Sequence, residues 1–178
     1  MRWPAPPRSA LGRFQRKQLL NASAGQVIYA PWQADWQRFL PPLPQPWLGS
    51  ATQPPYACNG HGHFVPAVPQ DDGQAYWFSG ATYVDSADAQ AANTAADEAA
   101  NVQRLRELLP AFAPTLAQQQ QGQQGKIQRF VGVRCTTPTR LPKVQALAPG
   151  LWLCAGFGSR GLSHAPLAAE FLAAQIGT

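Results

Sequence analysis

The chain of 178 residues is 45% hydrophobic and 13% charged, which excludes a disordered or fibrous chain and is typical of one globular domain with a sizeable core. It contains no apolar run of the roughly 20 residues that a membrane-spanning helix needs, so we expect no membrane contact. The net charge of +5 favours an anionic partner such as phosphate, carboxylate or nucleic acid, although on charge alone a solvated basic surface is the simpler interpretation.

Acidic and basic residues are unevenly distributed along the chain. Seven of the nine acids lie between Asp71 and Glu107, and none lies between Leu108 and Ala169. The acid-free stretch contains the basic residues Lys126, Arg129, Arg134, Arg140, Lys143 and Arg160. A second basic cluster near the N-terminus contains Arg8, Arg13, Arg16 and Lys17. Both clusters are candidates for contact with an anionic partner.

The cysteines and histidines bear on the compartment and on metal binding. Cys58, Cys135 and Cys154 are odd in number and widely spaced, with no C-x-x-C pair, which favours a reduced, cytoplasmic compartment. His61 and His63 would share one face of a strand, as two metal ligands can. No third ligand lies at a suitable spacing, so we expect no metal site.

The N-terminal part of the chain predicts little regular structure before the first strand. Residues 1–24 form a basic segment that we expect to be poorly structured, and 26–30 are predicted to be a strand. A long connection follows, because its prolines remove ladder donors and break helices. Strands are predicted at 61–67 and 75–83, joined into a hairpin by the turn at Asp71-Asp72-Gly73.

The middle of the chain contains one strongly periodic segment. Alanine, valine and leucine recur at three- and four-residue spacing between Ser86 and Pro110, which predicts a helix of three or more turns. Ser86 or Asp97 is the candidate N-cap, and Pro110 ends or kinks the helix. The glutamine-rich run 118–125 is predicted to be a low-complexity loop.

The C-terminal third alternates strands and loops before a final helix. A strand is predicted at 126–136, a proline-punctuated loop at 138–150 and a short buried strand at 151–155. The predicted helix 162–176 is apolar nearly all round, so it should be buried on most sides. The whole pattern predicts an α+β fold with a mixed, largely antiparallel sheet.

Gly156, Gly158 and Gly161 form a G-x-G-x-x-G between the predicted strand and the last helix. A dinucleotide-binding βαβ unit also needs a second parallel strand and an acidic residue about 20 positions further on, and this sequence stops before both. The glycines would let a ligand approach the backbone, and the helix start would stabilise an anion or a ring that becomes anionic. A tight strand–helix turn that only packs closely is an equally good interpretation.

Arg134 lies in VGVRCTTP, between a predicted strand and a proline-rich loop. A guanidinium held at the end of a strand can project into a cleft, and its planar fork suits a carboxylate. A surface salt bridge is the alternative, although the local sequence contains no acid to pair with it.

Several segments together resemble a known enzyme family. VGVRCTTPTRLP, followed by GLWLCAGFGSRGLSHAPLAAEFLAAQ, is similar to the C-terminal end of D-amino-acid-oxidase-like (glycine-oxidase-like) flavoenzymes. Within them it resembles the FAD-dependent oxidoreductase module of the bacterial bifunctional tRNA 5-methylaminomethyl-2-thiouridine biosynthesis proteins. GHGHFVPA, FSGATYV and NVQRLRELLP resemble earlier motifs of that module in the same order, so the resemblance covers roughly 25–176.

This resemblance implies FAD as the cofactor and assigns residues to it. The start of the last helix would face the flavin ring, where backbone N–H groups and the helix dipole stabilise the anionic reduced flavin. The implied flavin contacts are Gly156, Phe157, Gly158, Ser159, Arg160, Gly161 and Leu162. Arg134 would hold the carboxylate of the substrate over the flavin, and no residue is assigned as a catalytic acid or base.

The resemblance also implies a division of the chain. Residues 25–149 would be the substrate-binding domain, and 150–178 would be a strand–glycine turn–helix that returns to an FAD domain. The FAD fingerprint and the methyltransferase domain of the bifunctional proteins are not in this sequence, so we interpret the chain as a fragment, a remnant or half of a split protein. The isolated chain should then bind FAD weakly or not at all. It should also expose an apolar patch, or bury it in a dimer, at Leu162, Leu167, Phe171 and Leu172.

The implied activity is oxidative removal of the carboxymethyl group from 5-carboxymethylaminomethyl-(2-thio)uridine in tRNA. FAD accepts a hydride from the carbon next to nitrogen, water hydrolyses the imine, and glyoxylate leaves. The basic stretches would contact phosphates of the anticodon stem-loop. The alternatives are a glycine-oxidase-like oxidase of small amines and a catalytically inactive remnant or partner module.

Overall fold

The computed structural model describes residues 20–42 and 55–176, which belong to two compact units. One contains Gly25–Val84 and Asp88–Gly132, and we call it the sheet–helix unit. The other contains, among the described residues, 20–24, 85–87 and 133–176, and we call it the glycine-turn unit. Each is described by itself.

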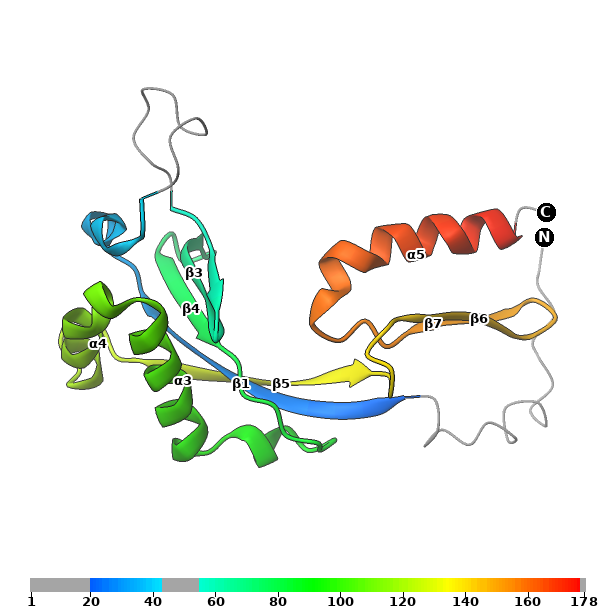
Figure 1. Cartoon of the computed structure of the whole chain (residues 1–178), viewed down its shortest axis with the longest axis horizontal. Coiled ribbons are helices and arrows are strands. Elements are labelled where there is room, and N and C mark those ends of the chain that lie inside the picture. The colour runs from blue at the N-terminus through cyan, green and yellow to red at the C-terminus, as the bar shows by residue number, and fades with distance from the viewer. Residues whose placement is uncertain (1–19, 43–54, 177–178) are drawn as a thin grey trace, which may run out of the picture. The chain divides into compact units, whose positions relative to one another are not determined.

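A five-stranded sheet has the strand order β2-β3-β4-β1-β5 (Figure 1). Its strands are β1 (Asn21–Pro31), β2 (Cys58–Gly60), β3 (Gly62–Pro69), β4 (Ala75–Gly80) and β5 (Gln128–Thr136). β4 pairs antiparallel with β1 and with β3, and β2 pairs antiparallel with β3. The predicted α+β fold with a largely antiparallel sheet is therefore confirmed.

The predicted strand boundaries need several corrections. β3 spans Gly62–Pro69 instead of 61–67, and β5 begins at Gln128 instead of 126. β1 begins at Asn21 rather than at 26, so the end of the segment expected to be poorly structured is part of a strand. β4 ends at Gly80, three residues before the predicted end. β2 was not predicted, because three residues are too few to show an alternating pattern. The predicted hairpin between β3 and β4 is confirmed, and its turn is closed by Asp72, whose carboxylate accepts the N–H of Gln74 at 2.9 Å.

Two helices cover one face of the sheet in the sheet–helix unit (Figure 1). They are α3 (Ala95–Leu108) and α4 (Ala113–Gln120), joined by a 3-10 turn at Pro110–Phe112; two further 3-10 helices span Ala34–Phe39 and Ala89–Ala92. The core between sheet and helices contains Ile28, Phe64, Trp77, Val102, Leu105, Phe112 and Leu116. Because side chains alternate along a strand, this core directs Tyr29, Tyr76 and Phe78 to the opposite face of the sheet.

The N-cap of α3 is Thr94, not Ser86 or Asp97 as predicted. The Thr94 hydroxyl accepts the N–H of Asp97 at 3.0 Å and donates to the Asp97 carboxylate at 2.5 Å. Asp97 is the third helical residue, so it supports the cap from inside the helix instead of forming it. Spacing alone did not distinguish these two roles.

The glutamine-rich run was predicted to be a loop, but its first residues belong to α4. Gln119 is fully buried, and its Oε1 accepts the indole N–H of Trp77 at 3.0 Å. Its Nε2 donates to the carbonyls of Pro31 and Gln124 at 3.2 and 3.3 Å. An amide can lie in this core because each of its polar atoms has a partner. The unbroken glutamines 118–121 are followed by Gly122, whose φ is +79°.

The glycine-turn unit contains a hairpin and the last helix. β6 (Lys143–Ala148) pairs antiparallel with β7 (Leu151–Ala155), and the 3-10 turn Gly158–Arg160 leads into α5 (Gly161–Ile176). The prediction of a loop at 138–150 is wrong, because its prolines flank β6 rather than interrupt it. β7 was predicted to be buried, but its residues are half-buried or exposed.

α5 is largely exposed within the residues that the structure describes. Ala168 is its buried residue, whereas Leu162 is 100%, Leu167 65% and Phe171 52% exposed. The prediction that this helix is buried on most sides is therefore wrong, and the expected exposed apolar patch is present. Among the described residues, no helix combines the length and the apolar character needed to cross a bilayer.

Candidate functional site

The end of β5 lies beside the turn that follows β7, and both belong to the glycine-turn unit. Thr136 and Phe157 form an isolated antiparallel bridge. A Cβ atom placed on Gly158 would lie 3.4 Å from Cγ2 of Thr136. The structure thus brings together the strand that contains Arg134 and the glycine motif, although the two are more than 20 residues apart in the sequence.

Arg134 leaves β5 on the face that carries the glycine turn. It lies two residues before Thr136, and residues two apart in a strand point to the same side. The Thr136 methyl group faces Gly158, so the half-buried Arg134 side chain starts from the same side of the strand. This is the placement expected of a side chain that holds a ligand at the turn.

Gly156 has a structural reason to be glycine. Its φ is +81°, a region that residues with a side chain rarely adopt, and a Cβ there would lie 2.4 Å from Cγ2 of Thr137. Thr137 is only 2% exposed, and its hydroxyl donates to the carbonyl of Leu141 at 2.7 Å. Close packing therefore accounts for Gly156 without a ligand.

Gly161 differs from Gly156 both in its φ and in the space that a Cβ atom would find. Its φ of −55° is helical, and a Cβ there would meet only Cβ of Phe157, at 3.9 Å. Neither the backbone nor the neighbouring side chains require glycine here. The missing side chain leaves open space at the first residue of α5, where helix N–H groups would meet an anionic or polar ligand.

The first turn of α5 is supported by its own side chains. The Ser163 hydroxyl donates to the carbonyl of Arg160 at 3.0 Å, and Nδ1 of His164 lies 3.1 Å from the same oxygen. Ser163 lies inside the helix, and its hydroxyl donates to a carbonyl instead of accepting an N–H as a cap does. Phe157, which precedes the 3-10 turn, makes no side-chain capping hydrogen bond. The 3-10 turn that leads into α5 thus has no side-chain cap.

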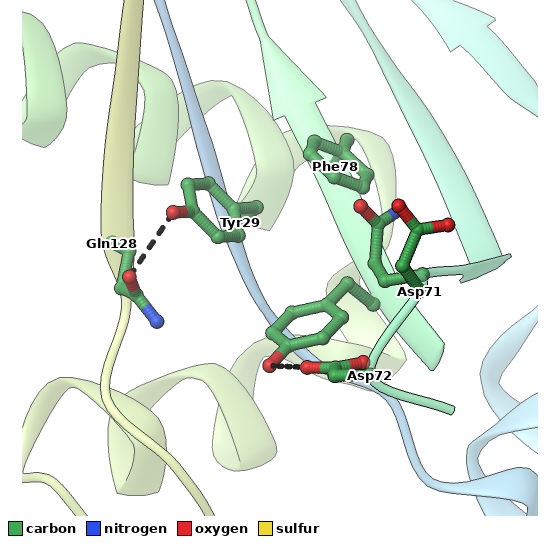
Figure 2. A pocket seen from close by; sticks show the side chains of 7 residues that line it. Tyr29, Asp71, Asp72, Phe78 and Gln128 are labelled. Carbon is green, nitrogen blue, oxygen red and sulfur yellow. Dashed lines mark hydrogen bonds between the residues drawn. The ribbon is translucent and has the colours of Figure 1, made fainter. Parts of the chain in front are cut away.

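A second candidate location is a pocket of about 340 Å³ on the open face of the sheet (Figure 2). Tyr29 donates to Oε1 of Gln128 at 3.0 Å and stacks on Phe78, with ring centroids 5.3 Å apart. The Tyr76 hydroxyl donates to Asp72 at 3.2 Å. The pKa of Tyr76 is raised, mainly by desolvation and secondly by the negative charge of this carboxylate. The lining is aromatic and acidic, so it does not favour a phosphate or carboxylate ligand. Sequence reasoning missed this pocket, because it treated the two aspartates only as turn residues.

Comparison with known proteins gives a family match over most of the chain. The family described as DAO, FAD dependent oxidoreductase, matches residues 11–175. A protein from Polaromonas sp. (strain JS666 / ATCC BAA-500), named tRNA 5-methylaminomethyl-2-thiouridine biosynthesis bifunctional protein MnmC, is 42% identical over 126 residues. The similarity covers 69% of this chain and 19% of that protein. The protein of the same name from Polaromonas naphthalenivorans (strain CJ2) is 40% identical over 147 residues, covering 81% of this chain and 21% of the relative.

A solved structure supports the fold. Iminodiacetate oxidase from Chelativorans sp. BNC1 superposes with a TM-score of 0.56 at 18% sequence identity, over 89% of this chain and 36% of that one. At this identity the likeness concerns the fold alone. The chain spans about a fifth of the length of the curated relatives that it matches.

Proposed function

Because the chain belongs to the DAO family of FAD-dependent oxidoreductases, we propose that it is the substrate-binding part of a flavin oxidase that modifies the wobble uridine of tRNA. The complete enzyme would remove the carboxymethyl group of 5-carboxymethylaminomethyl-(2-thio)uridine and release glyoxylate. The names of the relatives, at about 40% identity, support a tRNA substrate. The observation that carries the proposal is the position of Arg134, on the side of β5 that carries the glycine turn.

The glycine turn and the start of α5 fit a flavin ring. The open space at Gly161 and the 3-10 turn without a side-chain cap would offer room and N–H donors to the edge of the ring that becomes anionic. The proposed contacts are Gly156, Phe157, Gly158, Ser159, Arg160, Gly161 and Leu162. FAD, when bound there, supplies the hydride acceptor.

Arg134 would orient the substrate in this site. Two parallel hydrogen bonds from its guanidinium to the substrate carboxylate fix both the position and the angle of the adjacent C–H bond. β5 makes this possible, because a strand end holds the start of the side chain more rigidly than a loop. The role of Arg134 is therefore binding and positioning, without proton transfer.

The division of labour along the chain is part of the proposal. Residues 25–149 would bind substrate, residues 150–178 would contact the flavin, and residues 1–24 would lie outside both. An FAD domain, supplied in the same polypeptide or by a second chain, would complete the enzyme, and tRNA modification would place it in the cytoplasm. This chain alone should bind FAD weakly or not at all, because much of the binding surface lies in that domain.

The Arg134→Lys substitution tests the proposal in an enzyme completed by its FAD domain. We expect flavin content to be unchanged and turnover of tRNA carrying the carboxymethylated uridine to fall about 10²-fold, since small positioning errors have effects of this order. Glyoxylate release and single-turnover flavin reduction measure the loss.

Arg129→Lys is the matched control. It lies on the same strand and pairs with Glu98 at 3.3 Å in the sheet–helix unit, so it should leave turnover nearly unchanged. Equal turnover of the two variants would contradict the role of Arg134. Oxidation of glycine or another small amine, with no reaction on the modified tRNA, would contradict the proposed substrate.

A further inference from the structure

Three basic residues besides Arg134 lie close to the glycine turn in the backbone of the glycine-turn unit. The N–H of Arg140 donates to the carbonyl of Thr137 at 3.0 Å, which places Arg140 in the turn directly after β5. Lys143 begins β6 and is paired with Ala155, the residue before Gly156. The N–H of Arg160 donates to the carbonyl of Phe157 at 3.0 Å. We call Arg140, Lys143 and Arg160 the basic collar.

The basic collar is accessible and lacks internal ion-pair partners. Arg140 and Arg160 are exposed, and Lys143 is half-buried. None of the three forms an ion pair with any residue in 20–42 or 55–176. By contrast, Arg38 and Arg129 of the sheet–helix unit pair with Asp35 and Glu98 at 2.7 and 3.3 Å. The collar charges are therefore available to an external anion.

The two units also differ in net charge. The sheet–helix unit contains seven acids and five bases, a net charge of −2. The described residues of the glycine-turn unit contain two acids, Asp85 and Glu170, and four bases, which are Arg134 and the three collar residues, a net charge of +2. Two of the seven acids of the sheet–helix unit, Asp71 and Asp72, line the pocket on the open face of the sheet. A polyanion is therefore attracted to the glycine-turn unit and repelled by the other.

We propose that the basic collar binds the RNA phosphates that flank the nucleotide being oxidised, an inference that rests on the proposed function. Consecutive phosphates of a stacked strand are separated by about 3.4 Å along the helix axis. A nucleotide held by Arg134 at the glycine turn therefore brings its neighbouring phosphates to the residues around that turn. Arg140 and Lys143 are the residues placed there by the turn after β5 and by the β6–β7 pairing.

The test compares RNA binding by two double variants of the full chain. Arg140→Gln with Lys143→Gln removes two collar charges and keeps long polar side chains; Arg160 is left in place because it is also a proposed flavin contact. Arg106→Gln with Lys126→Gln removes the same two residue types from the sheet–helix unit. A fluorescent anticodon stem-loop RNA is titrated at several salt concentrations, and circular dichroism checks folding.

We expect the collar variant to lose at least about tenfold in affinity at 0.1 M salt, and its slope of log affinity against log salt to fall by about 1.5. The control variant should change both quantities only slightly. If the wild-type chain binds the RNA and the two variants lose affinity equally, the role of the collar is overturned, while the proposed tRNA substrate still stands. A wild-type chain that does not bind RNA overturns both.

Photo-cross-linking of the wild-type chain to the same RNA tests the inference without any substituted variant, so the result does not depend on whether the variants fold. Mass spectrometry should place cross-linked peptides within 133–160. Cross-links confined to 25–132 would overturn the collar even where binding is tight.

Discussion

Gly156→Ala, compared with Gly73→Ala, separates the cost of close packing at the glycine turn from the cost of its backbone conformation. A residue with a side chain at the φ of +81° costs about 1–2 kcal/mol. The added Cβ would also lie 2.4 Å from Cγ2 of Thr137, which is buried and held by its bond to Leu141. Overpacking of this kind costs about 1–3 kcal/mol. The lower chain entropy of the unfolded state offsets about 0.4–1 kcal/mol of this, so the two terms together destabilise the native state by about 1–5 kcal/mol.

Gly73→Ala is the matched control. Gly73 has a φ of +78°, but a Cβ there would meet nothing within 4 Å. It therefore carries the conformational cost alone, and the loss of chain entropy in the unfolded state offsets roughly 0.4–1 kcal/mol of it. The net loss should be about 1 kcal/mol or less.

Thermal unfolding compares the two variants, with hydrogen exchange to assign the loss to the glycine-turn unit. For a chain of this size about 1 kcal/mol corresponds to a Tm shift of about 2–4 °C, so Gly156→Ala should lower the Tm by several degrees more than Gly73→Ala. Thr137→Ser removes Cγ2 and keeps the hydroxyl, so it should restore part of the stability that Gly156→Ala loses. Equal Tm shifts at the two glycines, or no recovery with Thr137→Ser, would refute the packing argument.

Two further predictions concern the sheet–helix unit and the cysteines. Thr94→Ala should lower the free energy of unfolding by about 1 kcal/mol in urea, because α3 loses its capping hydroxyl, whereas Thr94→Ser should keep most of the stability; an equal loss would contradict the cap. A short maleimide pulse, mapped by peptide mass, should label the exposed Cys135 and Cys154 before Cys58. Burial makes Cys58 inaccessible and raises the pKa of its thiol, so first labelling at Cys58 would contradict this prediction. The raised pKa also means that the contribution of Cys58 to stability is complete below the unfolded value of about 8.5 and is lost as the pH rises through the folded value.

Elements with a strong local pattern could be predicted from the sequence. The periodicity of 95–108 identified α3, and the β3–β4 hairpin followed from its turn residues. α4 and β6 could not be predicted, because each depends on distant partners. The burial of Gln119 depends on Trp77, and the strand character of 143–148 depends on pairing with β7.

The candidate site was predicted in part. Arg134 and the glycine motif were both singled out, and the structure adds that Thr136 and Phe157 bring their segments together. Their roles stay predictions. Arg140 and Lys143 were counted only as charges of a loop, because nothing local shows that β6 begins at Lys143 opposite Ala155. The uneven distribution of charge was visible in the sequence, and the fold adds which unit each charged residue belongs to.

The buried amide in the glutamine tract has a consequence for how the length of that tract can vary. Glutamine occupies 118–121, so gain or loss of one repeat leaves a glutamine at position 119 to bond Trp77. The same slippage moves the glycine away from position 122 and puts a glutamine there, at a φ of +79°, at a cost of about 1–2 kcal/mol. The core contact thus tolerates a change of repeat number, whereas the turn that follows the glutamines is strained by it. A change of repeat number should therefore lower stability through the glycine turn and not through loss of the contact between Gln119 and Trp77.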